Sequence, residues 1–224
     1  MNIDPQTALK RTKTLMLDMD GTFLDLAFDN YVWRELVPRR FAVANDMPFE
    51  EARNILYAQF RAKQGQLDWY CLNHWADFLK LDVLQLHHDA SHRIGYLPGA
   101  LEFLRHVHGQ DVRVLLVTNA HPDLVEIKDA RTGLADYFDE LHSSHSYGYA
   151  KESQKFWSAF QEAVEFDPKT TLFVDDNFSV LQSARKFGID MLLRVTQPDS
   201  TVPAKQCTEF RGVEKVADML GGAG

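Results

Sequence analysis

The segment LMLDMDGTF, residues 15–23, constrains this chain more than any other feature. A short apolar run that leads into turn residues is typical of a buried parallel strand. Asp18 and Asp20 are spaced i, i+2, so on an extended chain both carboxylates project to one side. Open α/β sheets bind ligands beyond the carboxyl ends of their strands, and two anions there repel unless a cation or a proton separates them. The segment therefore favours a Mg²⁺ site beside a carboxylate that attacks phosphorus. The alternative is an aspartate that caps a helix before a turn.

A second acidic pair ends another apolar run. The sequence TLFVDDN, residues 171–177, delivers Asp175 and Asp176 at the end of a predicted strand. Mg²⁺ prefers oxygen ligands and commonly uses one or two carboxylates together with substrate phosphate and water. Two strands that both end in acidic pairs are hard to explain as surface polarity, so the pattern indicates a shared metal site.

Two more polar groups lie between the acidic pairs. VRVLLVTN ends a strand-like run at Thr118 and Asn119, and Lys151 lies in GYAKES, where a helix is expected to start. Taken alone, Thr118 would be a helix cap and Lys151 a solvated surface lysine. In this order along the chain, we favour a functional role for both.

In this order the four segments resemble the motifs of the haloacid dehalogenase (HAD) superfamily of phosphohydrolases: DMDGT from Asp18, TN at Thr118, Lys151, and DD at Asp175. Further segments are similar to the bacterial GMP/IMP 5′-nucleotidase branch of that superfamily: LDLAFDNYVW at 24–33, LDWYCLNHW at 67–75, TNAHP at 118–122 and HSYGYAKE at 145–152.

The resemblance implies a role for each motif residue. Asp18 would be the nucleophile that becomes an aspartyl phosphate. Asp20 would be the general acid for the leaving alcohol and then the base for water, and its backbone carbonyl would bind Mg²⁺. Thr118 and Asn119 would donate hydrogen bonds to phosphate oxygens. Lys151 would neutralise developing charge and orient Asp18.

The same resemblance implies a Mg²⁺ cofactor at this site. The expected ligands are Asp18, Asp20, Asp175 and Asp176. Asp176 is the preferred ligand from the second pair, and Asp175 binds either directly or through water.

Alternating strand-like and helix-like runs predict an α/β fold with a doubly wound parallel sheet. The expected strands are Thr14–Asp18, Val112–Thr118, Glu140–Ser143, Thr171–Asp175 and Met191–Val195. The expected helices are Gly99–Val107, Asp123–Thr132, Ser153–Val164 and Ser179–Phe187. Gly133 and Gly188 are expected to end helices, and the chain from Gln197 is expected to form a loop and one short helix.

The region 25–95 interrupts the alternation of strands and helices, because it holds an aromatic-rich helical pattern and no convincing strand. We expect a helical cap inserted after the first strand, with residues 96–99 as the return hinge, and a core made of residues 1–24 and 96–224. Cap aromatic side chains could stack on a purine base, although most would simply pack the small helical core. The candidate substrate contacts are Asn30, Trp33, Tyr70 and His121.

Composition excludes some functions. The net charge of −8 argues against broad binding to nucleic acid or to an anionic membrane. The two cysteines, Cys71 and Cys207, form no CxxC pair, and no apolar leader or run of transmembrane length is evident, so we expect a cytoplasmic protein. The sequence does not indicate an oligomeric state.

Together these features predict a Mg²⁺-dependent phosphomonoesterase whose partner is a small phosphate ester, with purine nucleoside monophosphates preferred. The rival predictions are a HAD phosphatase or phosphomutase for sugar phosphates or phosphoglycolate, and a catalytically silent binding module on the same fold. A haloacid dehalogenase is disfavoured, because such members typically lack the second aspartate of the first motif, here Asp20.

Overall fold

The computed structural model describes residues 3–206 and 209–221. Its centre is a parallel sheet of six strands in the order β3-β2-β1-β4-β5-β6. The strands are β1 (Thr14–Leu17), β2 (Arg113–Thr118), β3 (Glu140–Ser143), β4 (Thr171–Asp175), β5 (Met191–Val195) and β6 (Arg211–Val213). The strand order reverses between β1 and β4, which is where an open α/β sheet forms its ligand crevice. The predicted doubly wound sheet is therefore confirmed.

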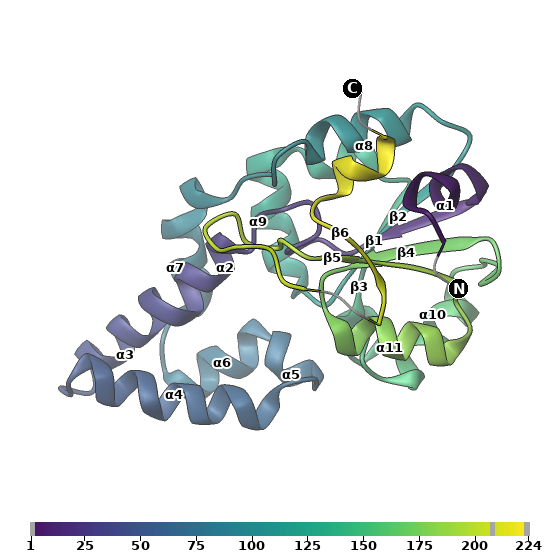
Figure 1. The fold of residues 1–224 in the computed structure, drawn as a ribbon. Helices are drawn as coiled ribbons and strands as arrows, with labels where there is room; N and C mark the ends of the chain where they lie inside the picture. The colour runs from purple at the N-terminus through teal and green to yellow at the C-terminus, as the bar shows by residue number, and fades with distance from the viewer. Residues whose placement is uncertain (1–2, 207–208, 222–224) are drawn as a thin grey trace.

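Helices cover both faces of the sheet (Figure 1). One layer contains α10 (Gln154–Ala163) and α11 (Phe178–Phe187), and the other contains α1 (Pro5–Arg11), α8 (Ala100–His108), α9 (Pro122–Thr132) and the 3₁₀ helix η5 (Val216–Leu220). Side chains alternate between the layers along β1. Leu15 and Leu17 belong to the core on the α8 side, and Met16 belongs to the core on the α10 side. Burial on both faces explains why three consecutive residues of this strand, 15–17, are apolar.

A helical lobe occupies the chain between β1 and β2 and projects to one side of the sheet (Figure 1). It comprises α2 (Ala27–Tyr31), the π-helix η1 (Val32–Leu36), α3 (Val37–Ala44), α4 (Phe49–Lys63), α5 (Leu67–Tyr70), α6 (Leu72–Leu79), α7 (Val83–Ala90) and η2 (Ser91–Arg93). Its aromatic side chains pack edge to face, as between Phe60 and Trp75 with ring centroids 4.9 Å apart. The predicted helical insertion is confirmed.

The lobe joins the rest of the chain through two adjacent segments. Leu24 forms an antiparallel bridge with Tyr96, and the backbone N–H of Asp25 donates to the carbonyl of Gly95 at 2.9 Å. The backbone that enters the lobe and the backbone that returns from it therefore run side by side at residues 24–25 and 95–96.

The remaining differences from the sequence-based expectations are local. The segment after Gln197 was expected to contain only loop and one helix, and this was wrong, because the three-residue strand β6 precedes η5. Gly133 and Gly188 do end helices in the left-handed conformation, with φ of 65° and 117°. Two further 3₁₀ turns are η3 (Leu134–Tyr137) and η4 (Ser144–Tyr147). Within the described residues, no helix has the length and apolar character needed to cross a membrane.

Candidate active site

The first acidic motif lies at the end of the central strand. The backbone N–H of Asp18 still donates to the carbonyl of Val174 at 3.0 Å, and the chain then leaves the sheet in a tight turn. Gly21 adopts φ of 83°, and a Cβ there would lie 2.7 Å from Pro198 Cβ and 3.0 Å from Asp176 Cγ. A glycine is needed at this position because the turn packs directly against the second acidic pair.

Lys151 joins the two acidic motifs. Its Nζ donates to Asp18 Oδ1 at 2.5 Å, to Asp175 Oδ2 at 2.9 Å and to the carbonyl of Val117 at 2.8 Å. The side chain is 2% exposed, so the alternative of a solvated surface lysine was wrong. Burial acts to lower the pKa of Lys151, but the carboxylates of Asp175 and Asp18 outweigh it and hold the pKa above its usual value. The lysine is therefore a fixed positive charge.

The carboxylates of Asp18, Asp175 and Asp176 form one cluster, with an oxygen from each lying within 4.8 Å of the others. Burial raises the pKa of Asp18, against the opposing charge of Lys151. Burial, followed by the charge of Asp175, raises the pKa of Asp176 to about 7. A cation among these groups would favour their ionised forms, so the donor set suits a hard divalent ion.

Asp175 is already engaged through both carboxylate oxygens. Oδ1 accepts from the backbone N–H of Asn177 at 2.7 Å, and Oδ2 accepts from Lys151. No such hydrogen bond involves the carboxylate of Asp176 among the described residues. Asp176 is thus the freer of the two to bind a metal directly.

Thr118 and Asn119 lie at the end of β2, beside this cluster. Thr118 Oγ1 accepts from the backbone N–H of Ala120 at 3.0 Å, so its own hydrogen remains available to donate. Asn119 accepts from the backbone N–H of Lys151 at 2.9 Å and donates to Glu152 at 3.0 Å. Thr118 does not cap α9, whose N-cap is His121.

Glu152 was not predicted, although it adjoins Lys151 in sequence. Its second oxygen accepts from the hydroxyl of Tyr70 at 2.7 Å, so it connects the lobe to the end of β2. Burial, with Glu152 adding to the effect, raises the pKa of Tyr70 well above its usual value and keeps its hydroxyl protonated.

Lys128 and Asp29 are a second set that the sequence analysis missed. Lys128 Nζ donates to Asp20 Oδ1 at 2.5 Å and to Asp29 at 2.9 and 3.0 Å. The lysine side chain is 1% exposed. One signal was available: Lys128 follows Leu124 by four residues, so it lies on the buried face of α9.

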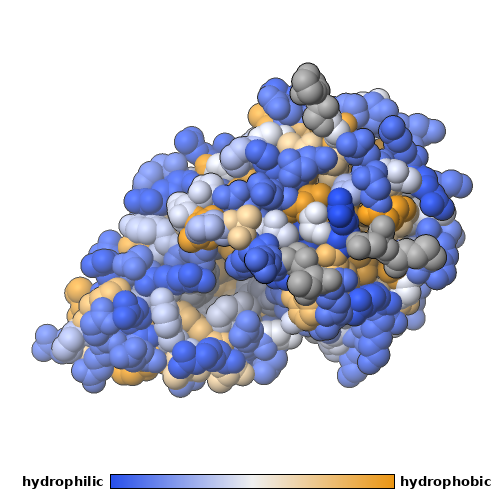
Figure 2. Space-filling model, in the orientation of Figure 1, coloured by the Kyte–Doolittle hydropathy of each residue, from blue (hydrophilic) through white to orange (hydrophobic). Residues whose placement is uncertain are grey.

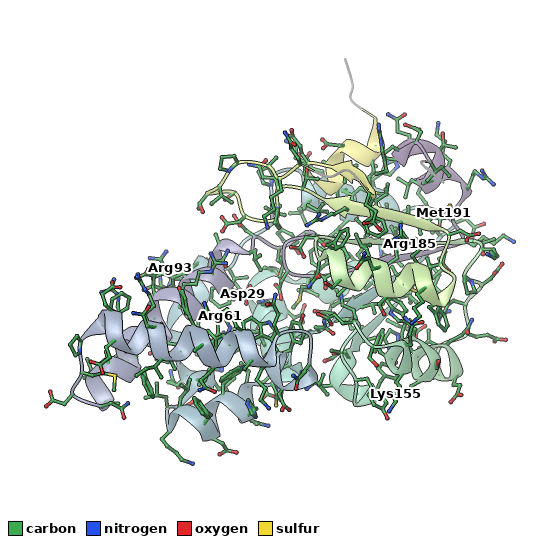
Figure 3. All side chains as sticks on the ribbon, turned by 60° about the horizontal axis from the view of Figure 1, so that its bottom comes forward. Asp29, Arg61, Arg93, Lys155, Arg185 and Met191 are labelled. Carbon is green, nitrogen blue, oxygen red and sulfur yellow. The ribbon has the colours of Figure 1, made fainter. Side chains whose placement is uncertain are left out.

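A cavity of about 510 Å³ opens between the lobe and these groups, and Figure 2 shows this face hollowed there. It reaches all seven motif residues: Asp18, Asp20, Thr118, Asn119, Lys151, Asp175 and Asp176. The lobe contributes Asn30, Trp33, Tyr70, Arg34, Tyr57 and Trp69, with Asp29 from α2 and Arg61 from α4 labelled in Figure 3. Asn30 also donates to Asp199 at 2.7 Å. Among the sequence-predicted contacts, His121 alone is not part of this lining.

The comparisons with known proteins agree with this fold and geometry. The family model described as haloacid dehalogenase-like hydrolase matches residues 12–188. The GMP/IMP nucleotidase YrfG of Escherichia coli is 40% identical over 193 residues, which cover 86% of this chain and 87% of that protein. The pyrimidine 5′-nucleotidase YjjG of the same organism is 36% identical over 81 residues, 36% of each chain.

Solved structures share the fold. A HAD phosphatase from Thermococcus onnurineus superposes with a TM-score of 0.76 at 19% identity, over 94% of this chain and 99% of that one. The HAD-hydrolase YfnB from Bacillus subtilis, bound to magnesium, gives a TM-score of 0.64 at 19% identity, over 93% and 97%. The chain described here belongs to the haloacid dehalogenase-like hydrolases.

Proposed function

We propose that this protein is a Mg²⁺-dependent 5′-nucleotidase that hydrolyses purine nucleoside monophosphates, with GMP and IMP preferred. The observation that carries the proposal is the Asp18 carboxylate, which Lys151 holds beside Asp175 and Asp176 at the floor of an aromatic-lined cavity. The similarity to the GMP/IMP nucleotidase YrfG supports the substrate class. In this proposal residues 25–95 are the cap, and residues 1–24 and 96–224 are the core of a cytoplasmic enzyme.

Asp18 is the nucleophile. A carboxylate oxygen forms a bond to phosphorus while the bond from phosphorus to the ribose 5′ oxygen breaks, which leaves an aspartyl phosphate. The charge of Lys151 opposes the burial that raises the pKa of Asp18, and its hydrogen bond orients the carboxylate.

Asp20 transfers the protons. Burial, followed by the charge of Asp29, raises the pKa of Asp20 to about 6, so about a tenth of the molecules carry this proton at pH 7, far more than for an ordinary aspartate. That proton passes to the leaving 5′ oxygen. The resulting carboxylate then takes a proton from a water molecule, whose oxygen attacks phosphorus and releases phosphate and Asp18. A positioned acid and base of this kind contributes about 10²–10⁴ in rate.

Mg²⁺ would be held by Asp18, Asp176 and the backbone carbonyl of Asp20, with Asp175 contributing directly or through water. When bound, the ion supplies positive charge that offsets repulsion between the phosphate and the aspartates. Thr118 donates its free hydroxyl hydrogen to a phosphate oxygen. Asn119 donates one amide hydrogen to Glu152 and has a second one to donate to a phosphate oxygen.

The lobe recognises the base. The indole rings of Trp33 and Trp69 offer stacking surfaces, and stacking contributes about 1–3 kcal/mol per base. Arg61 lines the same cavity and makes no hydrogen bond or ion pair with the described residues. A guanidinium group can donate to both O6 and N7 of a 6-oxopurine, so Arg61 suits GMP and IMP better than AMP, which carries an amino group at C6.

The test is kcat/KM for purified protein with GMP, IMP, AMP, UMP, glucose 6-phosphate and phosphoglycolate. We expect GMP and IMP to give the highest kcat/KM. A higher kcat/KM for glucose 6-phosphate or phosphoglycolate would be consistent with the phosphatase chemistry but would overturn the nucleotidase assignment. No hydrolysis of any ester with Mg²⁺ present would favour the silent binding module.

A further inference from the structure

Cys71, His121 and His145 form a second cluster of potential metal ligands. One ligand atom from each lies within 4.8 Å of the others. Cys71 belongs to the lobe, between α5 and α6, whereas His121 precedes α9 and His145 lies in η4. The cluster therefore spans the boundary between the lobe and the sheet-containing part. It shares no residue with the carboxylate cluster.

His145 presents a nitrogen with no partner. Its Nε2 is fully buried and makes no hydrogen bond of standard geometry within the described part of the chain, while the backbone of Asn119 and of Tyr70 lies close enough to the ring to offset part of the lowering of its pKa. Leaving a buried polar atom unpaired destabilises the folded state, and such atoms in native proteins call for an explanation such as an ion or a ligand. Burial, with His121 adding to the effect, lowers the pKa of His145 and favours the neutral imidazole that binds metals.

The ring of His121 lies against that of His145, and its Nδ1 is close to Asp123. The two rings are 4.9 Å apart between centroids and inclined at 71°. His121 Nδ1 accepts from the backbone N–H of Asp123 at 3.4 Å and lies 3.5 Å from the Asp123 carboxylate. Binding a metal through Nε2 requires the ring hydrogen to lie on Nδ1, where it would be donated to the Asp123 carboxylate in place of the long contact with the backbone N–H.

Cys71 provides the softest of the three groups. Its Sγ accepts from the backbone N–H of His74 at 3.5 Å, at the N-terminus of the eight-residue helix α6. The N-terminus of a helix favours negative charge, which suits a metal-bound thiolate.

We propose that Cys71, His121 and His145 bind a divalent transition metal, with Zn²⁺ as the best match. Thiolate and imidazole ligands select zinc over magnesium, which prefers oxygen. Three protein ligands leave a fourth position for water. Bond lengths of about 2.3 Å to sulfur and about 2.0 Å to nitrogen place ligand atoms about 3.5 Å apart in a tetrahedron, so binding draws the three side chains together.

Because Cys71 comes from the lobe and both histidines come from the sheet side, the metal ties the lobe to the core. Tyr70, next to Cys71, lines the substrate cavity and bonds to Glu152. A lobe held in this position slows the exchange of substrate and product. Zinc is therefore an inhibitor that acts away from the carboxylates. This consequence rests on the proposed function, whereas metal binding itself does not.

Cobalt titration of the full chain in excess Mg²⁺ tests the binding. We expect one Co²⁺ per chain, with a thiolate-to-cobalt charge-transfer band that one equivalent of Zn²⁺ removes. Cys71→Ser and His145→Gln should each lose the band. The matched controls Cys207→Ser, at the chain's other cysteine, and His88→Gln, at an exposed histidine of α7, should keep it. Circular dichroism verifies that each variant is folded.

A native protein without the band, or a band that persists in folded Cys71→Ser, would overturn the site. A separate activity measurement tests the tether: Zn²⁺ should inhibit native protein in excess Mg²⁺ and inhibit Cys71→Ser at least tenfold more weakly. Equal inhibition of both proteins would mean that zinc acts by displacing Mg²⁺ from the carboxylates, which overturns the tether. The cobalt band is measured without substrate, so the test of metal binding remains valid even if the nucleotidase proposal fails.

Discussion

Lys128 Nζ lies 2.5 Å from Asp20 Oδ1, and the same ammonium group contacts both oxygens of Asp29. Asp29 comes from α2 in the lobe, Lys128 from α9 and Asp20 from the turn after β1. A buried lysine thus fixes the proposed general acid and connects it to the lobe. Because this ammonium group opposes the raised pKa of Asp20, it also sets how readily that group gives up its proton.

Lys128→Met is expected to destabilise the fold and change the pH profile. Removing one partner of a buried ion pair costs about 3–5 kcal/mol. Without the ammonium group the pKa of Asp20 rises further, so the basic limb of kcat/KM should move to higher pH. Lys169→Met is the control, since its pair with Asp190 is exposed and such pairs contribute about 0–1 kcal/mol. Urea unfolding and a pH–rate profile measure both effects, and an unshifted basic limb would contradict the role of Lys128.

Magnesium should stabilise the protein more above neutral pH than below it. The folded-state pKa values of Asp176 and Asp20 are raised to about 7 and about 6. Between about pH 4 and pH 7 the folded protein therefore binds more protons than the unfolded chain, and the free energy of unfolding falls as pH rises. Mg²⁺ bound to the ionised carboxylate of Asp176, and close to that of Asp20, would offset that loss.

The measurement is the Mg²⁺-induced rise in Tm at about pH 8 and about pH 5, where linkage predicts the larger rise at the higher pH. Asp176→Asn should shrink the difference between the two rises. Equal rises at both pH values in the native protein would mean that Mg²⁺ does not bind to these groups.

Removal of metal should abolish hydrolysis. Chelation is expected to stop turnover, and added Mg²⁺ to restore it, because the three clustered carboxylates otherwise repel the phosphate. Asp176→Ala should raise the Mg²⁺ concentration needed for half-maximal rate by at least about 10–100-fold, since that loss already follows from removing an outer-shell partner of a metal ligand. Full activity in rigorously metal-free buffer would exclude a metal-dependent mechanism.

Substitution of Arg61 in the lobe part of the cavity should change the preference among substrates more than the rate of phosphate-ester hydrolysis itself. Arg61→Gln is expected to lower kcat/KM for GMP by about 10–100-fold, since a bidentate arginine contributes about 1–3 kcal/mol to base discrimination. Hydrolysis of a small generic ester should change little. Arg53→Gln on the same helix is the control, because Arg53 pairs with Glu50 and does not line the cavity. Equal losses for GMP and for the generic ester would remove Arg61 from base recognition.

The sequence predicted the strands that carry the acidic motifs, because apolar runs ending in paired aspartates are local patterns. It also predicted that Lys151 and Asp175 would share a site. It did not predict β6, which has only three residues and a central glycine. The π-helix η1 was not distinguished from an α-helix, because the spacing of apolar residues does not separate i→i+5 from i→i+4 hydrogen bonding.

The partners of the motif residues were harder to predict. Lys128 lies 108 residues from Asp20 and 99 residues from Asp29 in the sequence, and only the packing of the lobe against α9 and the sheet brings the three side chains together. The role of Glu152 was missed for the same reason, because its hydrogen bond with Tyr70 joins the lobe to the sheet-containing part. Sequence patterns report which side chains end strands, whereas contacts between separately formed elements depend on the tertiary fold.

The central claim is that Asp18 attacks phosphorus, and an acid-quenched single turnover tests it most directly. With GMP labelled in its phosphate group and Mg²⁺ present, the account predicts label attached covalently to the native protein and released as phosphate on longer incubation. Asp18→Asn should remain folded, carry no label and lose nearly all turnover. Near-native turnover by Asp18→Asn, in a preparation free of contaminating phosphatase, would contradict the covalent mechanism.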